Sequence, residues 1–125
     1  NICTNAGLCA LAFSIHMTLL GEAGLRQLAA INHSRAKKAA AALAGVNGVT
    51  LLNTSFFNEF TILLPTDARA LVHRLAEKGV LAGVSLGRLY PANDGLANGL
   101  VVAVTETVTE EDIAAFVAAL TEELA

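Results

Sequence analysis

The sequence predicts an α+β domain in which a short, mainly antiparallel sheet carries helices on one face. Apolar residues recur at helical spacing in several segments, and short apolar runs of strand length lie between the later ones. Gly or Pro separates most neighbouring segments. Helices segregated to one side of a short sheet are typical of an α+β layer, and 125 residues are enough to bury one core.

The first predicted helix is unusually apolar. It begins after Thr4 or Asn5, because both residue types are common N-caps, and it ends at Leu20, because Gly21 breaks the pattern. Apolar residues surround it almost completely, which is typical of a helix that is buried on more than one side. We expect this helix to expose a large apolar face or to bury that face by self-association.

A longer and more amphipathic helix is predicted over residues 22–44, with Gly45 as its C-terminal cap. Residues 22–125 are therefore expected to form the α+β domain. Residues 1–21 are expected to link to, or pack on, a large domain that lies outside this sequence.

Two strands and a third helix are predicted next. Val49–Leu52 and Phe57–Leu64 have the apolar content and the length of strands. Thr66 or Asp67 caps the helix that follows, and Gly79 ends it.

The C-terminal third is predicted to be extended and then helical. Val80–Tyr90 is a Gly-punctuated extended segment, and Leu100–Thr105 is a buried strand. Thr109 and Asp112 form an approximate capping box for the closing helix. The residues that this helix is expected to bury are Ile113, Phe116, Val117, Leu120 and Leu124.

Composition and charge exclude some classes of partner. Apolar residues make up 54% of the chain and charged residues only 15%, against roughly a quarter in a typical soluble domain. This excess predicts that part of the apolar surface is covered by something outside the chain. The net charge is −3 and the longest basic run is Lys37–Lys38, so we expect no nucleic-acid partner. We also expect no membrane partner, because the apolar stretch Ala6–Leu20 is shorter than the roughly 20 residues that span a bilayer.

The cysteines and histidines predict neither a disulfide nor a metal site. Cys3 and Cys9 would lie on opposite sides of one helix, so they cannot form a disulfide within it. A protein without disulfides fits a reducing, cytoplasmic setting, and we expect both cysteines to be small buried hydrophobic residues. His16, His33 and His73 lie in three separate predicted helices and lack the spacing of metal ligands.

The lysines and glycines predict no catalytic residue. A lysine that forms a Schiff base must be desolvated, whereas Lys37, Lys38 and Lys78 are all predicted to lie in solvent. The glycines at 79, 83 and 87 lack the spacing of a phosphate-binding loop. The residues alone therefore indicate an α+β domain without a self-contained active site.

Several segments nevertheless resemble one family as a set. These segments, in chain order, are Asn1–Asn5 (Asn-Ile-Cys-Thr-Asn), Phe56–Phe60, Gly79–Gly83 followed by Leu86–Pro91, and Ala103–Glu106 leading into Thr109–Ile113. Together they resemble subunit 1 of the glycine decarboxylase P-protein family, across essentially the whole chain. The resemblance implies the small C-terminal domain of the aminotransferase-like pyridoxal-phosphate fold.

The resemblance also implies a function in the glycine cleavage system. In that family glycine is decarboxylated with pyridoxal phosphate as cofactor, and the aminomethyl group passes to the lipoyl arm of the H-protein. The implied partners are the lysine-bearing subunit 2, which would hold most of the cofactor, and the lipoylated H-protein. The late strand Leu100–Thr105 lacks the carboxylate-binding arginine of aminotransferases, so substrate binding is not expected from this domain. The fragment alone is expected to be inactive and to self-associate.

Thr4 is the single candidate cofactor contact. In relatives of this fold, a Thr-containing segment ahead of the first small-domain helix contacts the cofactor phosphate in the neighbouring subunit. A hydroxyl and backbone N–H groups at a helix N-terminus suit a phosphate. The alternative is that Thr4 only caps the helix, which capping statistics favour.

Two other functions fit the same order of elements. The chain could be the small domain of another pyridoxal-phosphate enzyme, similar to a cysteine desulfurase, or a stand-alone α+β module that binds a regulatory ligand. The upstream coding sequence distinguishes them, because only the enzymes require a preceding domain.

Overall fold

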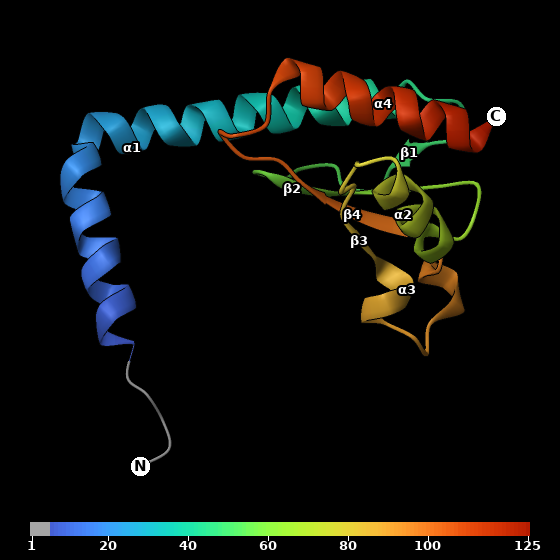
Figure 1. The fold of residues 1–125 in the computed structure, drawn as a ribbon, viewed down its shortest axis with the longest axis horizontal. Helices are drawn as coiled ribbons and strands as arrows, with labels where there is room; N and C mark the ends of the chain where they lie inside the picture. Colours follow the sequence, from blue (N-terminus) through green and yellow to red (C-terminus); the bar gives the residue numbers. More distant parts are fainter. Residues whose placement is uncertain (1–5) are drawn as a thin grey trace, which may run out of the picture.

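The computed structural model of the protein describes residues 6–125 and shows an α+β fold (Figure 1). Its elements are α1 (Gly7–Ala44), β1 (Thr50–Leu51), β2 (Glu59–Leu63), α2 (Ala68–Glu77), β3 (Val84–Ser85), α3 (Leu86–Leu89), the 3-10 helix η1 (Asp94–Leu96), β4 (Gly99–Ala103) and α4 (Glu110–Leu124).

The strands form one antiparallel sheet in the order β1-β2-β4-β3. The central pair β2–β4 has the longest register, with Phe60 opposite Val102 and Ile62 opposite Leu100. These four side chains are buried, whereas Thr61 and Val101, which lie between them along the strands, are more exposed. This alternation places one face of the sheet against the core and confirms the predicted antiparallel sheet.

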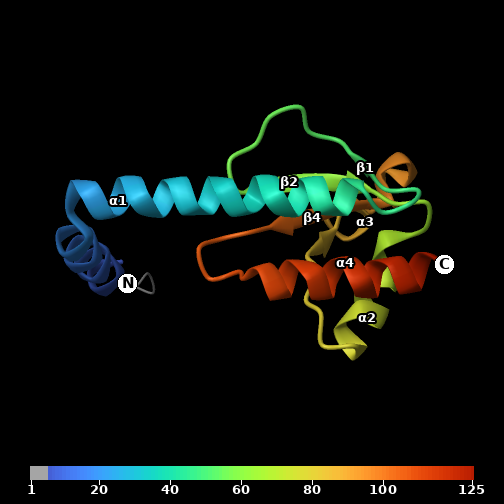
Figure 2. The ribbon, with the colours of Figure 1, turned by 90° about the horizontal axis from the view of Figure 1, so that it is seen from above.

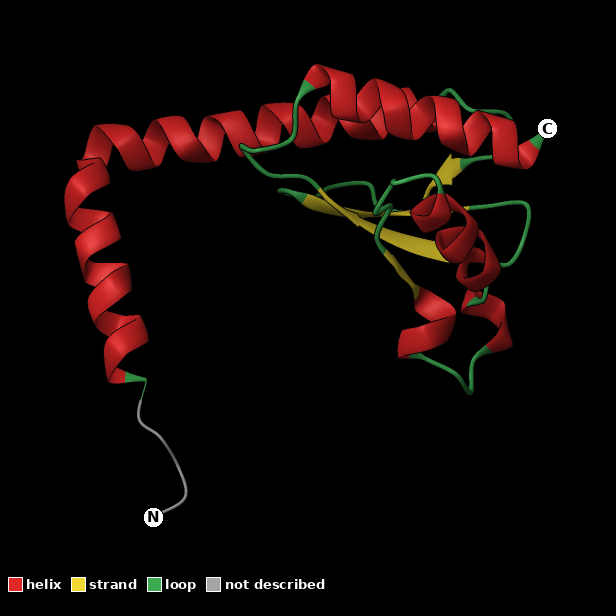
Figure 3. Ribbon diagram, in the orientation of Figure 1, coloured by secondary structure: helices red, strands yellow, loops and turns green. Residues whose placement is uncertain are grey.

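The helices cover that one face, as predicted. The C-terminal part of α1, α4 and α2 form a layer over the sheet, with α4 between the other two (Figures 1 and 2). The colouring by secondary structure shows the same two layers (Figure 3). The largest fully buried side chains, which come from both layers, are Phe60, Leu43, Ile62, Leu71, Leu75, Leu100 and Leu120.

Gly21 breaks the helical path at its predicted position, but the two predicted helices join into one kinked α1. Gly21 has φ 61° and ψ −174°, a conformation open essentially only to glycine. The first part of α1 consequently turns away from the rest of the molecule (Figure 1). Ala6 precedes α1 without a side-chain cap, and the predicted caps Thr4 and Asn5 lie outside the described residues.

Local capping defines the starts of two later helices. The Asp67 carboxylate accepts hydrogen bonds from the backbone N–H groups of Arg69 and Ala70, at 2.8 and 3.1 Å. Thr109 and Asp112 form the predicted capping box at α4, and bonding to the Thr109 backbone lowers the pKa of the Asp112 carboxyl. Of the two predicted caps of α2, Asp67 is the correct one.

The prediction for Val80–Tyr90 was only partly right. The segment is extended at β3 but then forms the short helix α3. Long-range packing explains the difference. A Cβ at Gly83, which has φ 139°, would lie 2.0 Å from the Val101 carbonyl oxygen. A Cβ at Gly99 would lie 2.5 Å from Leu86 Cδ1, so Leu86 packs over that glycine and the chain turns there. The glycines at 79, 83 and 87 are expected from the sequence to allow tight turns or backbone packing, which Gly83 shows, but the sequence pattern does not identify the partner residues.

Candidate functional site

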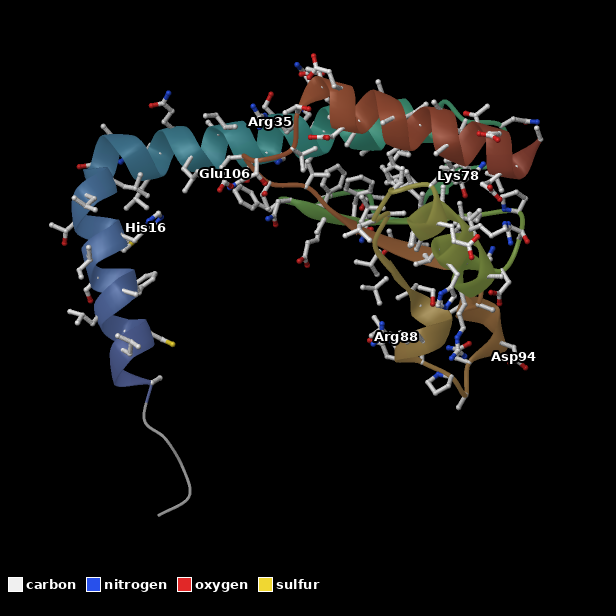
Figure 4. All side chains as sticks on the ribbon, in the orientation of Figure 1. His16, Arg35, Lys78, Arg88, Asp94 and Glu106 are labelled. Carbon is white, nitrogen blue, oxygen red and sulfur yellow. The ribbon has the colours of Figure 1, made fainter. Side chains whose placement is uncertain are left out.

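Residues 7–20, the N-terminal part of α1, form an arm that the rest of the described chain does not cover. We call this segment the apolar arm. Leu8 and Leu19 are 80% and 81% exposed, and Leu11, Phe13 and Ile15 are each more than half exposed. Figure 4 shows the arm, with His16 labelled on it, projecting away from the sheet and the other helices. The predicted exposure of a large apolar face is therefore observed.

The apolar arm makes α1 as apolar as helices that are normally buried against a membrane or another protein surface. By length and hydropathy alone, α1 could cross a membrane. Core helices of soluble proteins and signal sequences near an N-terminus meet the same criterion, so it does not identify the covering partner. The arm carries no charged residue, whereas Glu22 and Arg26 form an exposed ion pair one turn beyond the kink.

Cys9 corrects one prediction. It was expected to be buried but is an exposed free thiol on the apolar arm. The expectation assumed that its helix packs within the chain, and no described segment packs on the arm. The prediction for Cys3 falls outside the described residues.

The Lys78 ammonium group is ion-paired with two carboxylates, which makes Lys78 a poor nucleophile. Its Nζ lies 2.9 Å from Glu122 and 2.7 Å from Glu123 on α4. Hydrogen bonds to Glu123 and then Glu122 raise the pKa of Lys78 above its ordinary 10.5. Lys38 pairs with Glu110, and Lys37 is exposed. The described lysines are thus surface residues or ion-paired, as the sequence predicted.

The histidines do not gather into a site. His33 lies on α1, where its Nδ1 is 2.9 Å from the Phe57 carbonyl oxygen and its ring stacks on Phe57 at 5.7 Å. His16 is on the apolar arm and His73 is on α2, both exposed. The described residues contain no group of three or more metal-ligating side chains.

Strand β4 has no polar side chain that could bind a substrate. Leu100 and Val102 point into the core, and the adjacent positions are also aliphatic. Thr4, the predicted cofactor contact, lies outside the described residues. Residues 6–125 therefore bring together no catalytic set, and the apolar arm is their clearest functional feature.

Comparisons with known proteins agree on one family. A profile described as "Glycine cleavage system P-protein" matches residues 1–120. The probable glycine dehydrogenase (decarboxylating) subunit 1 of Sphingopyxis alaskensis is 76% identical over 125 residues, which are 100% of this chain and 28% of that protein. The chain spans about 28% of the length of the first curated relatives that it matches.

Solved structures show the same relationship. A crystal structure of glycine decarboxylase (P-protein) of the glycine cleavage system, in inhibitor-bound form, has a TM-score of 0.83 and 37% identity over 98% of this chain and 27% of that chain. The aminotransferase TlmJ from Streptoalloteichus hindustanus has a TM-score of 0.60 at 15% identity, over 84% of this chain and 35% of that chain. The second likeness concerns the fold alone, and it confirms the expected aminotransferase-like architecture.

Proposed function

Because the chain belongs to the glycine cleavage system P-protein family, we propose that its full-length subunit takes part in the decarboxylation of glycine. In this proposal, glycine loses its carboxyl group as carbon dioxide and its aminomethyl group passes to the lipoyl arm of the H-protein. The present residues form the C-terminal small domain of that subunit. Support comes from the family match over residues 1–120 and from the fold shared with a solved P-protein.

Pyridoxal phosphate, whose aldehyde can bind an amine and draw electrons from it, is the cofactor that this function implies. The described residues do not suit covalent binding of that aldehyde, because Lys78 is held protonated by two glutamates. Lys37 and Lys38 are exposed. We therefore assign no chemical step to this domain, and we propose, from the family resemblance, that the cofactor-binding lysine belongs to the second subunit.

The cofactor assignment is testable on the isolated chain. After incubation with pyridoxal phosphate and reduction with borohydride, we expect no lysine to be labelled stoichiometrically under dilute conditions. Peptide mapping by mass spectrometry measures the labelling. Full labelling of Lys78 would contradict the assignment, and slow, partial labelling of the exposed Lys37 is the expected background.

The single observation that carries the domain's role is the exposure of the apolar arm. Residues 7–20 contain no charge, and side chains such as Leu8 and Leu19 have four-fifths of their surface in solvent. Contiguous apolar surface of this kind marks an interaction site in a soluble protein. We propose that the rest of the subunit, or subunit 2, covers the arm, and that the assembled enzyme is cytoplasmic.

Activity of the assembled enzyme tests the proposed function. Both full-length subunits are co-produced with pyridoxal phosphate, and carbon dioxide release from carboxyl-labelled glycine is measured with lipoylated H-protein. We expect release to require both subunits and the lipoylated H-protein. Release of carbon dioxide by subunit 1 alone, or no release from glycine by the complete complex, would contradict the proposal.

Charge on the apolar arm tests the assigned role of this domain. Leu19→Asp in full-length subunit 1 should weaken co-purification of subunit 2, or lower the stability of subunit 1, because an unpaired carboxylate would be buried. Leu81→Asp is the matched control, because Leu81 is 91% exposed but lies outside the arm. Equal effects of the two changes would exclude a special role for the arm.

A further inference from the structure

A basic pocket of about 230 Å³ lies between α2 and the segment that contains β3 and α3. The lining side chains include Arg69, Val72 and His73 from α2, and Ser85 and Arg88 from the β3–α3 segment. We call this the basic pocket. Arg88 lies on α3, on the side of the sheet away from the α1–α4 pair (Figure 4). The pocket is therefore separate from the apolar arm.

The two arginines of the basic pocket differ from the other described arginines. Arg26, Arg35 and Arg74 each have an oxygen partner in the described chain, either a carboxylate or a backbone carbonyl. The guanidinium groups of Arg69 and Arg88 have no hydrogen bond or ion pair among residues 6–125. No aspartate or glutamate lines the pocket. Two unneutralised cations thus share one cavity in a chain of net charge −3.

Ser85 adds a hydroxyl without a protein partner to the same pocket. It is 4% exposed and is the buried polar residue of the described core, yet its hydroxyl has no hydrogen-bond partner among residues 6–125. Its hydroxyl oxygen is not among the buried unsatisfied side-chain atoms of the described residues, so it stays accessible, and Ser85 lines the basic pocket. An oxygen atom bound in the pocket would give this hydroxyl a partner.

The local backbone fixes the donors relative to one another. Arg69 and His73 are four residues apart and lie one turn apart on the same side of α2. Ser85 is the residue just before α3, without a side-chain cap bond, and Arg88 follows three residues later. Gly83 lets β3 approach β4 so closely that a Cβ there would collide with the Val101 carbonyl. The pocket therefore borders the sheet at this close contact.

We propose that the basic pocket binds a phosphate group, either free or carried by a small ester. Two guanidinium forks, one hydroxyl and one imidazole match the several acceptor oxygens and the double negative charge of a phosphate. The cavity has room for the phosphate and for a few attached atoms. This site shares no lining residue with the apolar arm and does not depend on the proposed decarboxylase function.

Calorimetric titration of the two-subunit holoenzyme tests the proposal. Bound pyridoxal phosphate already fills its own phosphate site, and chloride keeps the ionic strength constant. Inorganic phosphate and phenyl phosphate are titrated separately, and tighter binding of the ester identifies a ligand larger than phosphate. Either anion binding at one site per subunit 1 supports the proposal.

Variants assign the binding to the pocket. Arg69→Gln and Arg88→Gln should each weaken binding at least about tenfold, the scale of one hydrogen bond to a charged group. Ser85→Ala should weaken it by a few-fold while leaving the charge unchanged. Lys37→Gln, which removes an exposed cation outside the pocket, is the matched control and should have no effect.

Several outcomes would overturn the proposal. One such outcome is that neither anion binds the holoenzyme, and another is that Lys37→Gln weakens binding as much as Arg88→Gln does. A holoenzyme structure with an acidic side chain of another chain in the pocket would also overturn it. Thermal unfolding checks that each variant is folded, and Arg69→Lys keeps the charge if Arg69→Gln does not fold.

Discussion

At the scale of single residues, the ion pairs between α2 and α4 show how the described charges serve the fold. Lys78 and Arg74 contact Glu123 from the C-terminal end of α2. Hydrogen bonds from Lys78, and then from Arg74, lower the pKa of Glu123 below its ordinary 4.5. One carboxylate therefore joins two cations of α2 to the last turn of α4.

Glu123 should make stability depend on acid. Because its pKa is lower in the folded chain, its stabilising contribution is complete above about pH 4.5 and is lost as pH falls through the folded value. We expect Glu123→Gln to lower the melting temperature at neutral pH and to flatten its decline in acid. Thermal unfolding between about pH 3 and 7 measures both effects. Glu77→Gln is the control, and parallel curves for wild type and Glu123→Gln would contradict this account.

Thr4 remains a prediction from the sequence, as a contact to the cofactor phosphate in the partner subunit. In the assembled enzyme, Thr4→Ala should weaken pyridoxal-phosphate affinity by about 1–2 kcal/mol, the scale of a hydrogen bond to a charged group. Thr4→Ser should be nearly silent because it keeps the hydroxyl. Cofactor titration measures the affinity. Unchanged affinity together with lower thermal stability would show that Thr4 only caps a helix.

At the scale of elements, signals carried by neighbouring residues predicted the structure best. Asp67 and the Thr109–Asp112 box define α2 and α4 through bonds within one turn, so the sequence alone located both helices. The turn from β3 into α3 depends on contacts with β4, distant in sequence, and was missed. The basic pocket was missed for the same reason, because Arg69 and Arg88 become neighbours only in the folded chain.

The kink in α1 should depend on glycine. Alanine at position 21 would pay about 1–3 kcal/mol to keep φ at 61°, so Gly21→Ala should straighten α1 and redirect the apolar arm. Spin labels on Cys9 and on Glu111→Cys, in a Cys3→Ser background, should then lie farther apart. Ser34→Ala is the control, because Ser34 is exposed on α1 and lies away from the kink. The same label distance in both variants would show that other contacts hold the kink.

At the scale of the whole molecule, the apolar excess seen in the composition corresponds to a defined surface. The core is closed by the sheet and helix layers, while the apolar arm lies outside it. The sequence predicted that such a surface exists. It could not show whether the rest of the chain packs on the arm, because that depends on contacts between segments distant in sequence.

The isolated chain should therefore self-associate. Leu8, Leu11, Ile15 and Leu19 share one side of the arm, and pairing two such faces would remove them from water. Light scattering after size exclusion should show dimers or larger species. Leu11→Asp should shift the equilibrium toward monomer at least about tenfold, since a carboxylate is costly to bury. Leu81→Asp is the control, and a monodisperse wild-type monomer would refute the prediction.

In the proposed two-subunit enzyme, the uncharged arm also bears on the fate of subunits that have not assembled. The domain folds around its own core, and the 14 apolar-arm residues stay exposed to solvent until a partner surface covers them. Chaperones and proteases recognise exposed apolar segments of this kind, so subunits made in excess would be removed while assembled ones persist. The bend at Gly21 would then keep the arm exposed for recognition in unassembled chains, whereas the complete enzyme would cover it.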